Sequence, residues 1–358
     1  TLVTVRNDFG DGSKVLQQSS GFYSLYMRFD MNAKVAWERK FDKHGISAAA
    51  IYDIQSYTAN GRNNSTKRMT TSATVSYAYD NRYMLNAVAS WSGSAYLAPG
   101  KRFNFYPAVS AAWIASNETF LKGLKNLDMM KLSASFGSSG WDGNLSHELF
   151  LPSFGSTGAQ GYYFSDGTYS YGVEEGVLPV EHLVPEKITR ATGMLEIAAF
   201  RNRFNVKANG FYEKVDDILI NASSVVSSIL GVGPGKQCAG RNDWMGADME
   251  ISWNDVRGDF VYGAYANVSY LTSRIVEDGQ EFQRYDYLYH KGNPVGQCYG
   301  LEADGFFNDN KDIKNTVTHT FATVKPGDIK YVDQNEDFKI TEEDVVPIGH
   351  SSIPEWYF

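Results

Sequence analysis

The feature of this 358-residue sequence that most constrains its fold is a period-two alternation of apolar and polar residues. From Leu25 to Glu38 the odd positions are apolar and the even positions are mostly polar or charged. Because successive side chains of a strand point to opposite faces, this pattern predicts a β-strand with one apolar and one hydrated face. The same alternation recurs in residues 67–79, 130–136, 203–213 and 247–253. The sequence therefore predicts an all-β, antiparallel protein.

Composition narrows the functions that such a fold can serve. The chain has 33 Lys and Arg against 41 Asp and Glu, a net charge of −8, which argues against a nucleic-acid partner held by phosphate neutralisation. Hydrophobic residues at 43% and aromatic residues at 14% exclude a disordered chain. No apolar run approaches the roughly 18 residues that a membrane-spanning helix needs.

The connections between the predicted strands alternate in length. We expect short turns, rich in turn-forming residues, at 41–45, 80–82, 200–203 and 254–258. We expect long loops at the opposite strand ends, near 140–185, 221–242 and 277–352. This wiring is typical of outer-membrane β-barrels, although a soluble sheet with one solvated face also alternates and stays open as an alternative.

Aromatic residues lie near the predicted strand ends, where the interfacial girdle of a barrel belongs. They are Trp37, Tyr77, Tyr79, Trp113 and Trp253. One connection at the short-turn end, residues 117–128, is longer than the others, and we predict a helical turn there. Its apolar residues are spaced to pack on another surface: Phe120, Leu121, Leu124 and Leu127.

Six motifs stand out along the chain. Three of them lie in the first half of the chain, in residues 81–87 (NRYMLNA), 103–114 (FNFYPAVSAAWI) and 127–137 (LDMMKLSASFG). Three more follow, in residues 183–189 (LVPEKIT), 292–297 (GNPVGQ) and 327–335 (GDIKYVDQN). In combination these motifs resemble the SusC-like TonB-dependent outer-membrane transporters of Bacteroidetes, and the resemblance spans roughly residues 70–358.

The resemblance implies a transmembrane β-barrel of about 22 strands, occluded by an N-terminal plug domain, in the outer membrane of a Gram-negative, Bacteroidetes-like cell. No plug domain is found in this chain, and roughly ten strands are expected in it, so residues 1–358 are predicted to be one partial, multi-pass barrel. The long loops would then face outside the cell.

The function implied by the resemblance is TonB-dependent active import of oligosaccharides or peptides. The implied partners are a SusD-like lipoprotein that captures substrate, the TonB complex acting through parts outside this chain, and outer-membrane lipid and lipopolysaccharide. No nucleic-acid partner is expected, and no catalytic motif rises above chance, so we expect no enzyme activity. Two alternatives stay open: a soluble β-rich carbohydrate-binding or adhesin module, and a structural barrel of an envelope assembly.

The predicted long loops combine aromatic rings with carboxylates, a set that suits sugar stacking and peptide contacts alike. For each residue, packing of a loop against the barrel or a partner is the alternative. The candidate substrate-binding residues are Trp141, Asp142, Tyr162, Tyr163, Phe164, Tyr169, Tyr171, Trp244, Tyr285 and Tyr287.

A calcium site is predicted late in the chain, where oxygen ligands have EF-hand-like spacing. No cofactor is required, and Ca²⁺ is the one candidate. Phe338 stands where the turn glycine belongs and the last ligand is Asp rather than Glu, so a solvated acidic turn is the alternative. The ligands would be Asp333, Asn335, Asp337 and Asp344.

The two cysteines, Cys238 and Cys298, both fall in the predicted long-loop end. Disulfides persist outside the cell, so we predict a Cys238–Cys298 disulfide, with two unpaired thiols in separate loops as the alternative.

Overall fold

One large antiparallel sheet dominates the fold. The structure is a computed structural model that describes residues 26–59, 65–156, 162–163, 169–221 and 232–358. The sheet contains 11 strands in the order β1-β2-β3-β4-β5-β6-β11-β12-β13-β14-β21. This confirms the predicted all-β, antiparallel fold. In the described ranges, no helix combines the length and apolar character needed to cross a membrane.

Ten strands of the sheet are long, between 12 and 22 residues, which exceeds the roughly 9 to 11 residues of a tilted bilayer crossing. They are β1 (Tyr26–Phe41), β2 (His44–Ala59), β3 (Ser65–Tyr79), β4 (Tyr83–Ser94), β5 (Phe103–Ile114), β6 (Leu127–Trp141), β11 (Glu186–Ala199), β12 (Phe204–Asn221), β13 (Lys236–Arg257) and β14 (Phe260–Glu277). The short strand β21 (Trp356–Tyr357) pairs with β14 at Ser269 and Tyr270.

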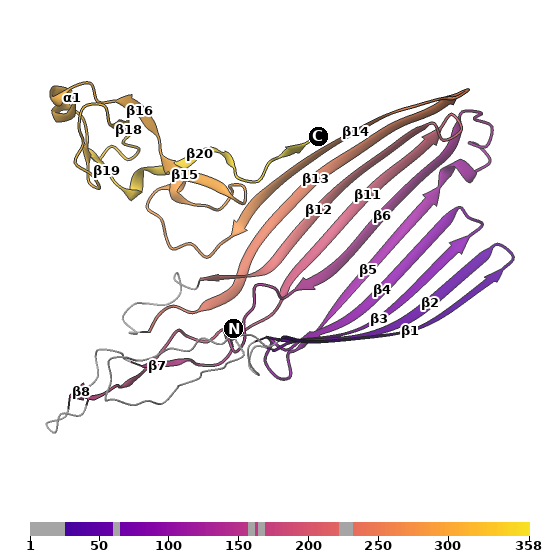
Figure 1. Cartoon of the computed structure of the whole chain (residues 1–358), viewed down its shortest axis with the longest axis horizontal. Helices are drawn as coiled ribbons and strands as arrows, with labels where there is room; N and C mark the ends of the chain where they lie inside the picture. The colour runs from indigo at the N-terminus through magenta and orange to yellow at the C-terminus, as the bar shows by residue number, and fades with distance from the viewer. Residues whose placement is uncertain (1–25, 60–64, 157–161, 164–168, 222–231) are drawn as a thin grey trace, which may run out of the picture.

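The sheet is curved, with short turns gathered at one end and long connections at the other (Figure 1). In these turns the chain reverses direction through residues in the left-handed conformation, as is common in tight hairpins. Asp80 and Asn81, between β3 and β4, have φ angles of 50° and 51°. Phe200, Arg201 and Asn202, between β11 and β12, have φ angles of 58°, 63° and 60°.

The strand register gives the sheet two chemically different faces. Ser72 lies opposite Ser90, and Ser135 opposite Thr192, on what we call the polar face. Val75 lies opposite Ala87, and Val109 opposite Phe136, on what we call the apolar face. The apolar face is uncovered, with Val109 for example 55% exposed. An apolar surface of this extent argues against the soluble alternative.

Two smaller units lie at the long-loop end. The first, which we call the loop module, spans residues 297–351 and is the orange and yellow part of Figure 1. Its elements are β15 (Gln297–Leu301), β16 (Ala303–Phe306), α1 (Asn310–Asn315), β17 (Thr318–His319), β18 (Ile329–Tyr331), β19 (Lys339–Ile340), η6 (Glu342–Asp344) and β20 (Val345–Ser351). It is preceded by η5 (Asp286–Leu288).

The second unit is formed by the connections β4–β5 and β6–β11. Their apolar residues Leu97, Leu145, Val180 and Leu183 are buried together. The longer connection also contains β7 (Phe154–Ser156), β8 (Tyr162–Tyr163), β9 (Tyr169–Ser170) and β10 (Val173–Glu175). The parts of the two connections around the four buried residues therefore pack together at the strand ends.

The segment predicted to be a helical turn, residues 117–128, contains one, since the backbone N–H groups of Leu121 and Lys122 both donate to the Glu118 carbonyl oxygen over 3.1 Å. A 3-10 turn, η2 (Ala115–Asn117), leads into the segment, and successive turns continue to β6. Gly123 within the predicted helical span and the start of β6 at Leu127 leave too few residues for a stable helix.

Close packing at Gly246 gives a test of the sheet register. A Cβ placed on Gly246 would lie 2.6 Å from the carbonyl oxygen of Tyr270 and 2.8 Å from the Phe211 ring. We expect Gly246→Ala to lower the free energy of unfolding by about 1–3 kcal/mol, because the backbone oxygen cannot move away cheaply. The control is Gly193→Ala, where nothing lies within 4 Å and the change should be within about 0.5 kcal/mol. Equal melting temperatures for the two variants would contradict the register.

Candidate functional site

The predicted substrate-binding residues lie in several places. Trp141 ends β6, and Trp244 lies in β13 opposite Glu213. Tyr171 is exposed. The backbones of Tyr162, Tyr163, Tyr169 and Ser170 form the β8–β9 pair. Phe164 lies outside the described residues.

Asp142 is held by an arginine that the sequence did not single out. Arg68 Nε donates to Asp142 Oδ2 over 3.1 Å, and Nη2 donates to Oδ1 over 2.5 Å. Arg68 lies on β3 and Asp142 follows β6, so this bidentate pair reaches across the ends of β4 and β5. It ties the β6–β11 connection to the polar face.

A cavity of about 290 Å³ lies beneath this ion pair, at the long-loop end of the polar face. We call it the mouth pocket. Its wall includes Ser92, Asn104, Tyr106 and Trp141. The side-chain nitrogen of Asn104 is buried and has no hydrogen-bond partner in the part of the chain that the structure describes. An unpaired buried donor is costly, so this amide is suited to an acceptor oxygen brought by a ligand.

Packed loops border the mouth pocket. Arg102 Nε donates to the carbonyl oxygen of Leu97 over 3.2 Å, and Leu97 itself is fully buried. Asn144 Nδ2 donates to Glu186 Oε1 over 2.5 Å, which ties the β6–β11 connection to the start of β11. The pocket is therefore preorganised by its supporting loops.

Tyr285 and Tyr287 form a second aromatic site. Their rings are stacked with centroids 5.4 Å apart and an interplanar angle of 8°. The Arg284 guanidinium lies 5.4 Å from the Tyr285 ring centroid, and Tyr287 Oη donates to the Glu343 carbonyl oxygen over 2.7 Å. Burial, followed by the nearby Asp344, raises the pKa of Tyr287, so its hydroxyl stays a donor.

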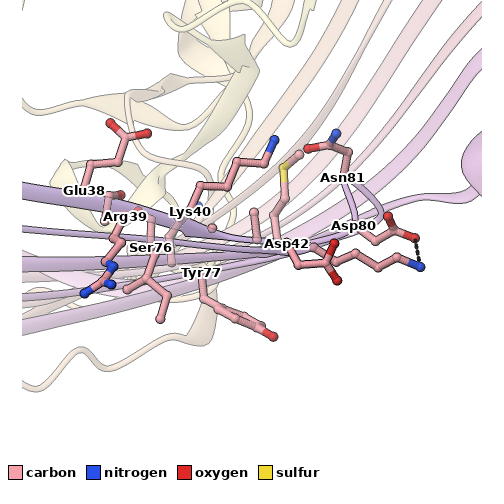
Figure 2. Close-up of a pocket in the computed structure, with 15 residues that line it drawn as sticks. Glu38, Arg39, Lys40, Asp42, Ser76, Tyr77, Asp80 and Asn81 are labelled. Carbon is pink, nitrogen blue, oxygen red and sulfur yellow. Dashed lines mark ion pairs between the residues drawn. The ribbon is translucent and has the colours of Figure 1, made fainter.

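A second hollow of about 430 Å³ lies at the opposite end of the sheet, beside the β1–β2 and β3–β4 turns (Figure 2). Charges of both signs line it. Glu38 and Lys40 come from β1, and Lys43 and Asp80 come from the turns and approach to 4.0 Å. Being of mixed sign, this end of the polar face has no ion preference of its own.

The polar face also carries a row of alternating charge across four neighbouring strands. Lys131 Nζ donates to Glu196 Oε1 over 2.9 Å, and Lys207 Nζ donates to Glu250 Oε1 over 3.4 Å. Glu196 lies opposite Lys207 in the register, so the four residues are at one level. The row keeps the face hydrated without net charge.

The predicted calcium ligands have other partners in the structure. Asp333 Oδ2 accepts from the Phe338 backbone N–H over 2.8 Å, and Asp337 Oδ1 accepts from that of Lys339 over 2.8 Å. Asn335 accepts from the Asp337 N–H, and the fully buried Asp344 from that of Gln334. Across the described ranges no three His, Cys, Asp or Glu side chains are arranged to hold a metal ion. The calcium site stays a prediction.

The predicted Cys238–Cys298 disulfide is not formed in the structure. Both thiols are free. Cys238 lies in β13 opposite Leu219, and its Sγ is 3.5 Å from the Val184 carbonyl oxygen. Cys298 lies in β15 opposite Ile348, in the loop module. The two residues belong to different sheets, which spacing along the chain did not reveal.

His319 is a buried titratable group of the loop module. Its ring lies 5.4 Å from the Phe307 and Tyr331 rings and 5.5 Å from that of Phe321. Its Nε2 is buried and has no partner within the described chain. Burial lowers the pKa of His319, although Asp328 acts in the opposite direction.

Comparison with known proteins relates the chain to two named receptors. No protein-family model matches it. TonB-dependent receptor P26 of Formosa agariphila is 25% identical over 300 residues, covering 79% of this chain and 29% of the receptor. TonB-dependent receptor SusC of Bacteroides thetaiotaomicron is 24% identical over 215 residues, covering 55% of this chain and 21% of the receptor. The chain therefore spans less than a third of the length of these relatives.

Solved structures show the same fold. The RagAB peptide importer in its closed-closed state matches with a TM-score of 0.71 and 14% identity, covering 93% of this chain and 39% of that chain. The open-open state of the importer matches with a TM-score of 0.71 and 15% identity, covering 93% of this chain and 38% of that chain. At this identity the likeness shows the fold alone, that of a sheet in a large β-barrel.

The Arg68–Asp142 pair gives a test of the loop anchor. We expect Arg68→Met to lower the local stability of residues 142–145 by about 1–2 kcal/mol, because Asp142 stays mostly buried without its partner. The effect is below that of a fully buried pair, since the Arg68 side chain is 42% exposed. Amide hydrogen exchange at Leu145 measures it. The control is Lys207→Met, whose exposed pair with Glu250 should matter less; equal exchange in both variants would contradict the anchor.

The buried His319 predicts a pH dependence of the loop module. Because its pKa is lowered in the folded state, the unfolded chain binds the proton first, and stability falls as the pH drops below about 6.5. Above that pH the His319 ring is neutral in both the folded and the unfolded chain, so it adds no pH dependence to the stability. Amide exchange at Thr318 and Thr320, corrected for intrinsic rates, measures it. We expect His319→Leu to remove this dependence and the control His350→Gln to keep it; a dependence unchanged in His319→Leu would refute the assignment.

Proposed function

We propose that this chain, which belongs to the SusC-like family of TonB-dependent outer-membrane transporters, forms part of the wall of a nutrient import path. The comparisons with known receptors confirm the resemblance found in the sequence, and the chain is part of an outer-membrane β-barrel. Its polar face is then the face toward the barrel interior, and its apolar face is the face toward lipid.

The observation that carries the proposal is the mouth pocket. A preorganised cavity with an unpaired donor, Asn104 Nδ2, opens at the long-loop end of the polar face. In a barrel of this wiring the long loops are extracellular, so the pocket lies where an incoming substrate first meets the interior. Oligosaccharides and peptides both carry the acceptor oxygens that such an amide binds.

The proposed transport path runs from the mouth pocket along the polar face to the short-turn end. The stacked rings of Tyr285 and Tyr287 offer a platform for a sugar ring or a peptide plane on the way in. Hydroxyl pairs such as Ser72–Ser90 and the Lys131–Glu250 row keep the wall hydrated. A plug domain elsewhere in the protein, remodelled by the TonB complex, would control passage.

The proposed partner outside the cell is a SusD-like lipoprotein that captures oligosaccharide or peptide and delivers it to the loops. Support comes from the named relatives, a SusC receptor and a RagAB importer, and from the loop module, which extends beyond the strand ends (Figure 1). Lipopolysaccharide and phospholipid would surround the apolar face. The proposed role is transport without catalysis.

Energised uptake is the direct test of this function. Cells that carry the full-length protein should accumulate labelled oligosaccharide or peptide, and accumulation should stop when the TonB complex is deleted. Uptake that persists without TonB would exclude energised import and favour a passive or structural barrel.

Asn104 gives the residue-level test. We expect Asn104→Ala to reduce the uptake rate at low substrate concentration by about 2–10-fold, because one hydrogen bond to substrate, worth about 0.5–1.5 kcal/mol, is lost. The control is Ser133→Ala, on the same face but outside the mouth pocket, and it should transport normally at equal surface expression. Normal uptake by Asn104→Ala would remove the mouth pocket from the path.

A further inference from the structure

The connection between β5 and β6, residues 115–126, is the longest at the short-turn end, and we call it the rim segment. Successive backbone bonds fold it: Glu118 N–H donates to the Ala115 carbonyl, Leu121 N–H to that of Glu118, and Leu124 N–H to that of Leu121. The sequence predicts that its apolar residues pack on another surface. In the described part of the chain Phe120 and Leu124 remain largely uncovered, at 70% and 53% exposed, while Leu121 is partly buried.

The rim segment is held on the apolar side of the sheet by contacts with aromatic residues of that face. The Phe120 ring lies 6.5 Å from the ring of Trp113, which pairs with Tyr83 on the apolar face. Glu118 joins both residues, accepting from Tyr83 Oη over 2.7 Å and from Trp113 Nε1 over 3.4 Å. Arg82 Nη1 also donates to Glu118 over 3.2 Å. The segment is therefore anchored on the lipid-facing side of the wall.

The rim segment is joined to further aromatic residues at the same end of the sheet, of which Phe200 is exposed and Phe204 and Trp253 are partly buried. Phe200 N–H donates to the Asn126 carbonyl over 2.9 Å, which joins the rim segment to the β11–β12 turn. The rings of Phe200 and Phe204 lie 6.1 and 6.2 Å from that of Trp253. Together these rings form a belt along the edge of the apolar face, as expected at a membrane–water interface.

Two cations flank the exposed apolar residues. Lys122 and Lys125 are exposed, and in the described ranges neither lies within ion-pair distance of a carboxylate, although Lys122 acts on Asp80 at longer range. Apolar side chains next to unpaired ammonium groups are the composition of segments that lie in a lipid interface, with the cations at headgroup phosphates. A protein that covered the same patch would have to supply anionic groups of its own opposite Lys122 and Lys125.

We propose that the rim segment docks into the phospholipid leaflet on the short-turn side of the membrane. Phe120 and Leu124 enter the acyl region beside Trp113, and Lys122 and Lys125 bind headgroup phosphates. The segment thereby sets the height of this part of the wall in the membrane, a role separate from substrate transport.

Spin labels test this placement directly. The full-length protein, with its other cysteines replaced, receives one label at Phe120→Cys or Leu124→Cys and is reconstituted in nanodiscs of phosphatidylethanolamine and phosphatidylglycerol. We expect collisions with oxygen to exceed those with a water-soluble nickel reagent, as for a label at the lipid-facing Val109→Cys. A label at Asn81→Cys, in a neighbouring short turn, serves as the aqueous control.

Two results would overturn the docking. Nickel collisions as frequent as at Asn81 would place the rim segment in water, and low collision rates with both reagents would show that protein covers it. Because the readout is depth and not uptake, it is independent of the proposed import.

The lysines are tested in the same system. With the label at position 120, Lys122→Gln combined with Lys125→Gln should shift the ratio of oxygen to nickel collisions toward the aqueous value. The control is Lys101→Gln, in the β4–β5 connection at the opposite end of the wall. An unchanged ratio in the double variant would overturn the phosphate contact.

Discussion

The backbone ladder that joins ten long antiparallel strands is the constraint on which the rest of the structure depends. In a membrane every strand N–H and C=O group needs a partner within the protein, and only a continuous ladder supplies one. The ladder also sets the register, and the register decides which face each side chain joins. Ser135 opposite Thr192 and Val109 opposite Phe136 are consequences of the same pairing.

The two ends of this wall differ because their connections differ. At one end, short turns built on left-handed Asp80, Asn81 and Asn202 leave the strand ends uncovered by loops, and the hollow there is lined by charges of both signs. The long connections at the other end are stabilised by their own apolar core around Leu97 and by the Arg68–Asp142 pair. The mouth pocket therefore depends on loop packing, while the path below it depends on strand register.

Much of the wall was predictable because successive side chains of a strand point to opposite faces, so a sheet with one apolar face has a two-residue period in its sequence. The alternation at residues 67–79 and 130–136 assigned the faces of β3 and β6 correctly. The rim segment was harder to predict: the spacing of Phe120 and Leu124 predicted packing on another surface, but spacing does not distinguish a protein surface from lipid. The predicted disulfide failed for a related reason, since loop membership does not place Cys238 and Cys298 in one sheet.

By itself the sequence determined the all-β class, the two faces and the unequal connections, because these follow from local periodicity and turn chemistry. Only the tertiary structure decided which distant residues meet. Arg68 and Asp142 are 74 positions apart, and they pair because sheet curvature brings β3 to the end of β6. Asn104 is left unpaired in the mouth pocket for the same reason: its surroundings come from four separate strands and two loops, whose convergence no local pattern records.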